Sequence, residues 1–285
     1  MCVKKQNLQI FMLAVIGFQI LEMQGFNNEY VGNDPYASFE VWGWQKDRFI
    51  KEDYIKYFPY YKKYVENIPF VDTSSIDFSM LPYPYNTLSK LMPYDLSLGF
   101  YCNSEYIAKL FALNHIVNVI EIGSDLGLST HHIASQLPND GRLYAIDTWD
   151  FTNEPWYNNQ RYTPFLSNVI RTGLTDKIFP IKNTSQEALE FFKLFRLKVD
   201  LIYVDGDHST EGVFRDLELY FPLLSAHGVI CGDDWLLKTV RAGVVQFAQK
   251  YQLTIYGACN FWFLRDEGRY QYKDFLEADD SVWIF

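Results

Sequence analysis

The feature that most restricts the fold of this chain is a regular alternation of apolar runs and helical patterns between Asn103 and Leu264. Each apolar run is short and nearly uninterrupted, as expected of a strand buried on both faces of a sheet. Strands that alternate with helices predict a parallel sheet with helices packed on both of its faces. The expected strands are Val117–Ile122, Arg142–Ile146, Ile178–Ile181, Val199–Val204, Gly228–Cys231, Leu253–Tyr256 and Asn260–Leu264.

The last two expected strands lie too close together in the chain for a crossover helix, so a hairpin must join them. This hairpin places one antiparallel strand at or near an edge of the sheet. We therefore predict an α/β fold with a doubly wound, mostly parallel, seven-stranded sheet and a C-terminal antiparallel hairpin. The expected helices are Ser104–Leu113, Gly127–Gln136, Pro164–Arg171, Gln186–Phe195, Glu211–Leu224 and Val240–Tyr251.

Three regions flank this α/β domain, which we expect to span residues 103–266. Residues 26–102 are dense in Tyr, Phe and Trp and are predicted to form an aromatic-rich extension or cap that packs on the domain. Its aromatic side chains either fill a core or line an acceptor pocket, and the first use is the commoner one. Residues 267–285 are expected to form a C-terminal tail.

Residues 1–25 form an apolar N-terminal segment. Two lysines precede an apolar run over residues 8–21, which has the length of a signal-peptide core and is short for a membrane span. No clear cleavage site follows. The segment is either a targeting signal or weak membrane anchor, or else a buried or membrane-surface helix. We expect a cytoplasmic protein, with membrane association through residues 8–21 as the alternative.

The composition excludes several classes of protein. Hydrophobic residues make up 48% and charged residues 21% of the 285 positions, which is typical of a globular protein with a core. The formal charge of −10 argues against nucleic acid as a partner, because phosphate binding needs clustered Lys and Arg. The four cysteines form no C-x-x-C pair, so neither a zinc knuckle nor a dithiol site is indicated. The oligomeric state is left open.

The first strand of the domain ends in a glycine turn, Glu121-Ile122-Gly123-Ser124-Asp125-Leu126-Gly127. Glycines there let the backbone approach a ligand, and the following helix begins with an electropositive end. The spacing is G-x-x-x-G and not the G-x-G-x-x-G of nicotinamide-binding proteins. It therefore favours a ligand without a pyrophosphate, although a purely structural tight turn is the alternative.

Polar residues also follow the second and third strands. Asp147 and Thr148 end the second strand, and an acid at that place can accept hydrogen bonds from the ribose hydroxyls of an adenosine ligand. Asn183-Thr184-Ser185-Gln186 follows the third strand and can reach an adenine edge. The carboxyl ends of parallel strands are where open α/β sheets bind ligands. These segments together predict an adenosine site.

Two acidic clusters follow the fourth and fifth strands. The fourth strand leads into Asp205-Gly206-Asp207-His208, and the fifth leads into Gly232-Asp233-Asp234-Trp235. Four carboxylates on one edge of a sheet repel each other, and oxygen ligands favour Mg²⁺, Ca²⁺ or Mn²⁺. The alternative is helix capping by Asp207 or Ser209, which accounts for one acid and not for four.

With these motifs the chain resembles class I S-adenosylmethionine (SAM)-dependent methyltransferases, and is most similar to the branch of catechol-type and macrolide-sugar O-methyltransferases. The resemblance covers about residues 103–266 and implies a Rossmann-like sheet. It implies that SAM contacts Glu121, Gly123, Ser124, Gly127, Asp147, Thr148, Ser185 and Gln186. It also implies metal ligands at Asp205, Asp233 and Asp234. Asp234 stands where the commonest pattern of the family has asparagine. The aspartate makes the site more negative, and it leaves open whether a metal binds and which one.

The expected activity is methyl transfer from SAM to a hydroxyl of a small molecule or sugar, assisted by a divalent metal such as Mg²⁺. Asp207 is the first candidate for the general base and His208 the second, while His208 as a support for its loop is an equal alternative. Two other functions compete with this one. They are a nicotinamide-dependent oxidoreductase on a similar sheet, and a non-catalytic SAM-binding scaffold.

Overall fold

The computed structural model describes residues 68–92, 101–150, 161–258, 260–265 and 283–284. The apolar segment 8–21, most of the aromatic extension and most of the tail therefore lie outside the described residues. Within the described ranges no helix has both the length and the apolar character that a membrane crossing requires.

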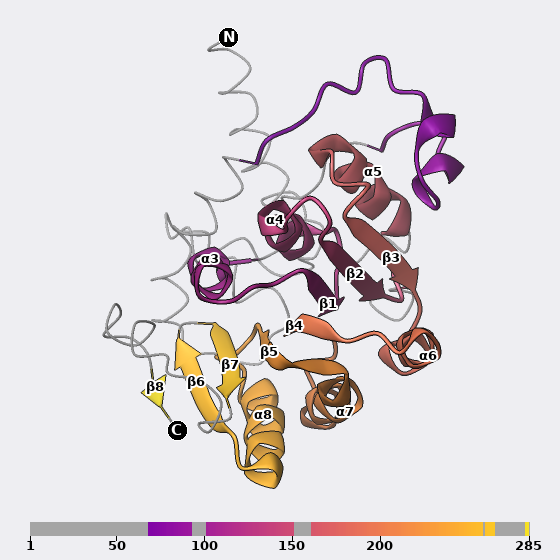
Figure 1. The fold of residues 1–285 in the computed structure, drawn as a ribbon. Coiled ribbons are helices and arrows are strands. Elements are labelled where there is room, and N and C mark those ends of the chain that lie inside the picture. The colour runs from indigo at the N-terminus through magenta and orange to yellow at the C-terminus, as the bar shows by residue number, and fades with distance from the viewer. Residues whose placement is uncertain (1–67, 93–100, 151–160, 259, 266–282, 285) are drawn as a thin grey trace, which may run out of the picture.

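The described residues form one sheet in the order β3-β2-β1-β4-β5-β7-β6-β8 (Figure 1). All neighbouring pairs from β3 to β5 are parallel, whereas β7 is antiparallel to both β5 and β6. The seven predicted strands are confirmed, and the short strand β8 adds an eighth from the region expected to be a tail. The strands are β1 (Asn118–Ile122), β2 (Arg142–Asp147), β3 (Ile178–Lys182), β4 (Val199–Val204), β5 (Leu224–Gly232), β6 (Thr254–Ala258), β7 (Phe261–Arg265) and β8 (Trp283–Ile284).

Helices cover both faces of the sheet, as predicted (Figure 1). One face carries α3 (Ser104–Leu113), α4 (Leu128–Gln136) and α5 (Tyr162–Thr172). The other carries α6 (Ser185–Phe195), α7 (Thr210–Tyr220) and α8 (Lys238–Tyr251). The helix predicted to reach Leu224 ends earlier, because Pro222 in the short 3-10 helix η5 (Phe221–Leu223) cannot donate a helical hydrogen bond.

The central strands are apolar throughout because each contributes to two cores. Val119 and Ile120 are neighbours on β1, yet Val119 packs under α3, α4 and α5 while Ile120 packs under α6, α7 and α8. Leu201 and Ile202 on β4 divide in the same way. Successive side chains of a strand point to opposite faces, so a strand between two layers of helices cannot alternate with polar residues.

The strand order reverses at β1, which lies between β2 and β4. After β1 the chain moves outward through β2 and β3, and then crosses back to β4 on the other side of β1. The connections after β1 and β4 therefore lead to helices on opposite faces of the sheet, α4 and α7, which leaves a crevice at the carboxyl ends of the strands. This crevice holds the candidate site.

The described part of the aromatic extension, residues 68–92, packs beside α5 and the edge strand β3 (Figure 1). The Tyr85 hydroxyl donates a hydrogen bond of 2.7 Å to the carbonyl of Ile178, where β3 begins. The backbone N–H of Val71 donates to the carbonyl of Arg171 at the end of α5, over 2.8 Å. Residues 68–92 thus cover one flank of the domain, and most of the remaining extension lies outside the described residues.

Tyr85 gives a direct test of this packing. Its side chain is 1% exposed, so Tyr85→Phe should leave the Ile178 carbonyl without its buried donor and lower the free energy of unfolding by about 1 kcal/mol. Tyr83 is 81% exposed, and Tyr83→Phe is the matched control that should change nothing. Urea unfolding followed by tryptophan fluorescence measures both. Equal stability of the two variants would show that the Tyr85 contact does not anchor the extension.

Candidate functional site

A cavity of about 450 Å³ lies at the carboxyl ends of β1, β2 and β4. This volume lies within the range of small-molecule sites. Four residues with predicted roles, Glu121, Gly127, Asp233 and Asp234, are not part of its wall. The predicted residues that do line it are Gly123, Ser124, Asp147, Thr148, Ser185, Gln186, Asp205, Asp207 and His208.

The glycine turn after β1 depends on close backbone packing. Gly123 and Gly127 both have a φ of +90°, which side chains of L-residues rarely tolerate. A Cβ on Gly123 would also collide with the backbone carbonyl of Asp205 in the loop after β4. Gly123 is therefore needed for the contact between two loops of the protein, in addition to its place on the cavity wall.

Glu121 lies one layer below the cavity. Its carboxylate is fully buried and accepts hydrogen bonds of 2.6 Å from the hydroxyls of both Ser124 and Ser129, and another from Thr130. Burial raises the pKa of Glu121, and the three hydroxyl donors oppose that shift. Ser124 and Ser129 line the cavity and Glu121 does not, so Glu121 orients the hydroxyls of these two wall residues.

Asp147 presents its carboxylate to the cavity from the end of β2. One oxygen accepts the backbone N–H of Asp125 over 2.8 Å, and the other accepts that of Trp149 over 2.7 Å. Burial raises the pKa of Asp147, and these N–H donors lower it. The two fixed donors leave further lone pairs of the carboxylate for a ligand, as a ribose-binding acid requires.

Arg161, at the start of α5, is a site residue that the sequence did not reveal. Its guanidinium pairs with the carboxylate of Asp125, and its side chain is 6% exposed and lines the cavity. Burial raises the pKa of Asp125, while the charge of Arg161 lowers it. No motif surrounds Arg161, and only the fold brings it to the glycine turn.

The adenine-side segment begins α6. Thr184 caps this helix, since its hydroxyl accepts the N–H of Glu187. The Ser185 hydroxyl donates over 2.6 Å to Asp216, a buried carboxylate from α7 that also lines the cavity and that the sequence did not single out. Ser185 therefore offers a ligand only its acceptor lone pairs, whereas Gln186 lines the cavity with an amide.

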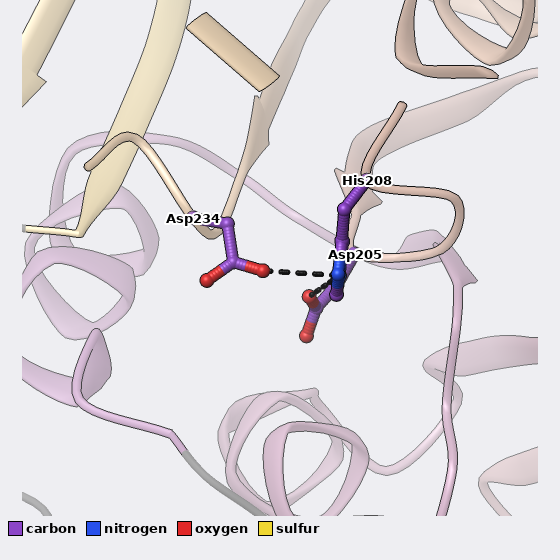
Figure 2. A group of neighbouring side chains, drawn as sticks. All are labelled: Asp205, His208 and Asp234. Carbon is purple, nitrogen blue, oxygen red and sulfur yellow. Dashed lines mark ion pairs between the residues drawn. The ribbon is translucent and has the colours of Figure 1, made fainter. Parts of the chain in front are cut away.

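Asp205 after β4 and Asp234 after β5 converge on His208, as Figure 2 shows. The His208 Nε2 atom lies 3.0 Å from a carboxylate oxygen of Asp234 and 3.7 Å from one of Asp205. Burial alone would lower the pKa of His208, but the charge of Asp234 and the contact with Asp205 raise it well above its usual value. The ligand atoms of these three residues lie within 4.8 Å of one another.

Asp233 points away from this group although it neighbours Asp234 in the chain. Its carboxylate accepts the side-chain amide of Asn260 over 2.6 Å and the Tyr203 hydroxyl over 3.3 Å. Burial and the charges of Asp205 and Asp234 raise the pKa of Asp233 well above its usual value. Among the described residues the possible ligand group is Asp205, His208 and Asp234, and Asp233 of the predicted set is not part of it.

Asp207 lies on the cavity wall, and its carboxylate is paired with groups at the start of α7 and within it. Its carboxylate accepts the N–H of Ser209 over 2.9 Å and pairs with Arg215 of α7 at 3.3 Å. Burial alone would raise the pKa of Asp207, but these two partners lower it. The capping alternative is confirmed for Ser209, whose hydroxyl accepts the N–H of Gly212 as the N-cap of α7.

The part of the chain that forms this site is similar to a known protein family. Residues 120–235, which run from β1 through the acids after β5, match the family described as "Methyltransferase domain". This part of the chain, less than half of its length, is therefore similar to methyltransferase domains. The match contains the glycine turn, Asp147 and both acidic segments of the chain.

Two plant proteins show the same likeness. The chain is 25% identical over 163 residues to a provisionally named caffeoyl-CoA O-methyltransferase of Arabidopsis thaliana, covering 52% of this chain and 66% of the relative. It is 28% identical over 154 residues to the tapetum-specific methyltransferase 1 of the same plant, covering 53% of this chain and 58% of that relative. The matches thus span less than two thirds of the relatives' lengths.

A solved structure, the O-methyltransferase TomG of Streptomyces achromogenes in complex with SAM, superimposes with a TM-score of 0.48 at 16% identity. The superposition covers 59% of this chain and 82% of TomG. That similarity is too low to assign a function, which must be argued from the site itself.

The Arg161 pair yields a stability prediction. Arg161→Met should lower the free energy of unfolding by about 2 kcal/mol, because it leaves Asp125 and Asp147 without the cation between them. Chemical denaturation at neutral pH measures this loss. Lys193→Met is the control, since Lys193 pairs with Glu190 at 56% exposure and should change stability by less than about 0.5 kcal/mol.

Adding Asp125→Asn to Arg161→Met should restore part of that stability, because the uncompensated carboxylate is then gone. If the double variant is as unstable as the sum of the single variants, the two side chains do not act as a pair.

Proposed function

We propose that this protein transfers the methyl group of SAM to a hydroxyl group of a small molecule or sugar. The observation that carries the proposal is the charge of the cavity wall. Five aspartates line the cavity, against two arginines and one histidine. Such a wall suits the positively charged sulfonium and amino groups of SAM and repels the pyrophosphate of a nicotinamide dinucleotide.

The chain's residues fit the parts of this cofactor. Asp147 is placed at the end of β2 to accept the ribose hydroxyls, and its two backbone donors fix its orientation. Ser185 and Gln186 supply polar groups for the adenine from the start of α6. The hydroxyls that Glu121 orients, together with the α4 end of the glycine turn, suit the amino-acid portion.

Methyl transfer is an in-line displacement at the sulfonium-bound carbon. The acceptor oxygen forms a bond to the methyl carbon, the carbon–sulfur bond breaks, and the hydroxyl proton passes to a base. The protein must hold the two reactants in line and keep water out. His208 lies on the cavity wall next to Asp205, where an acceptor hydroxyl can be brought to the cofactor.

We assign the base to His208 in preference to Asp207. Asp234 lies against Nε2 and raises the pKa of the imidazole, so His208 acts as a base once the pH is high enough to remove its proton. The pair with Arg215 makes Asp207 a weaker one, since it stabilises the ionised carboxylate. Asp207 thereby supports the loop at the start of α7. From the sequence alone, this supporting role was an open alternative for His208.

A divalent metal belongs to this proposal. Asp205 and Asp234 would supply two carboxylates to such an ion, with Mg²⁺ and Mn²⁺ as the candidates, while His208 beside them would accept the proton. The ion would stabilise negative charge on the acceptor oxygen. Asp233 contributes to this site through the turn it shares with Asp234, because its own carboxylate is engaged by Asn260 and Tyr203.

The cofactor assignment is tested by isothermal titration calorimetry. We expect SAM to bind and NAD⁺ not to bind, and Asp147→Ala to weaken SAM binding by roughly 5- to 150-fold, the effect of about 1–3 kcal/mol of lost hydrogen bonds. Asp140→Ala, an exposed acid in the turn before β2, should leave the affinity unchanged. Binding of NAD⁺ in place of SAM would establish the oxidoreductase alternative.

The base assignment is tested by following S-adenosylhomocysteine formation with a simple catechol, 3,4-dihydroxybenzoate, as the acceptor probe. His208→Gln should slow the reaction by about 10²- to 10⁴-fold, the range for a lost general base, with SAM affinity within a few-fold of the unmodified protein. Asp207→Asn should slow it by less than about tenfold. The reverse order of these effects would return the role to Asp207.

A further inference from the structure

Asn260 lies in the turn between β6 and β7, directly behind the acids that follow β5. Its side chain is 1% exposed. The amide nitrogen donates to Asp233 over 2.6 Å and to Asp234 over 3.1 Å. The amide oxygen of Asn260 accepts the N–H of Leu236 over 3.3 Å, and its backbone carbonyl accepts that of Trp235 over 3.0 Å. One residue therefore holds four successive residues of the acidic turn.

These contacts determine which oxygen of Asp234 faces the cavity side. Asn260 occupies one oxygen of the Asp234 carboxylate, and the other oxygen is the one that lies 3.0 Å from His208 (Figure 2). Asp234 also has a φ of +62°, a left-handed conformation that a non-glycine residue keeps only when its surroundings enforce it. The hydrogen bonds from Asn260 provide such enforcement.

The chemistry of an amide limits what Asn260 can do here. A carboxamide neither gains nor loses a proton near neutral pH, so it cannot act as an acid or base. Asn260 is also absent from the residues that line the cavity. Its amide nitrogen has two N–H donors, and two adjacent buried carboxylates are the acceptors that both donors satisfy.

We propose that Asn260 is the positioning residue that holds Asp234 against His208. The inference rests on the proposed function for its meaning in catalysis, because His208 is the base only in that reaction. The contact itself is a property of the folded protein without any ligand. It can therefore be tested whether or not a methyl acceptor is known.

The test measures how fast the Nε2–H proton of His208 exchanges with solvent, by ¹H–¹⁵N NMR of the full-length protein, with His208→Gln used to assign the signal. We expect Asn260→Ala to speed this exchange at least tenfold, because Asp234 is no longer held. Asn260→Ser, which keeps one donor, should give a smaller increase and is the fallback if the alanine variant does not fold. SAM affinity, measured by calorimetry, should stay within about threefold.

Two further variants distinguish a specific effect on the contact between Asp234 and His208 from a general loss of stability. Ile255→Ala removes a side chain of β6 that is 4% exposed and packs in the core under α8, so it should lower stability without changing the exchange of the His208 proton. Asp234→Asn alone should speed the exchange, and adding Asn260→Ala to it should have no further effect, because both act through one contact.

The proposal is overturned if Asn260→Ala leaves the exchange within twofold of the unmodified protein, or if Ile255→Ala speeds it equally. It is also overturned if the effects of Asp234→Asn and Asn260→Ala simply add. Failure of the unmodified protein to bind SAM would instead remove the proposed function. In that case the exchange data would still decide whether Asn260 holds Asp234 against His208.

Discussion

The close approach of two loop backbones at Gly123 is the constraint on which the rest of the site depends. Where β1 ends, the ladder continues into the loops, with hydrogen bonds of 2.8 Å from Gly123 to Ile146 and from Asp205 to Ile122. A side chain at position 123 would collide with the backbone of Asp205. The glycine turn and the first acidic segment therefore form one unit, so a cofactor on the turn lies at a fixed place relative to Asp205 and His208.

Charge compensation is the second constraint, because the cavity gathers more carboxylates than a buried site can hold unpaired. The protein supplies a separate cation for each region. Arg161 pairs with Asp125 at the glycine turn, Arg215 pairs with Asp207 at the start of α7, and His208 lies between Asp205 and Asp234. Of these three cations, the imidazole of His208 is the one whose ordinary pKa is nearest to neutral, and it lies at the end of the cavity where we place the chemistry.

The sequence predicted the sheet and the location of the site because both depend on local patterns. Apolar runs identified the seven strands, and the residues that follow β1, β2 and β4 had to meet at one edge. These patterns could not predict how deeply a single side chain is buried or which partner it contacts. The sequence did not show that the Glu121 carboxylate lies behind the cavity wall, where it accepts hydrogen bonds from Ser124 and Ser129. Arg161 and Asn260 carry no motif, since their partners lie at residues 125 and 233–236 of the chain.

Asp233 and Asp234 show why position in a motif does not decide a role. The two acids follow one strand, yet Asp233 turns inward to Asn260 and Tyr203 while Asp234 faces His208. The left-handed backbone at Asp234 produces this division, because it redirects the chain immediately after β5. Asparagine and aspartate are the residues other than glycine that adopt this conformation most readily. The asparagine of the commoner family pattern and the Asp234 of this chain therefore satisfy the same backbone requirement. What the aspartate adds is a negative charge, and in this structure that charge lies against His208.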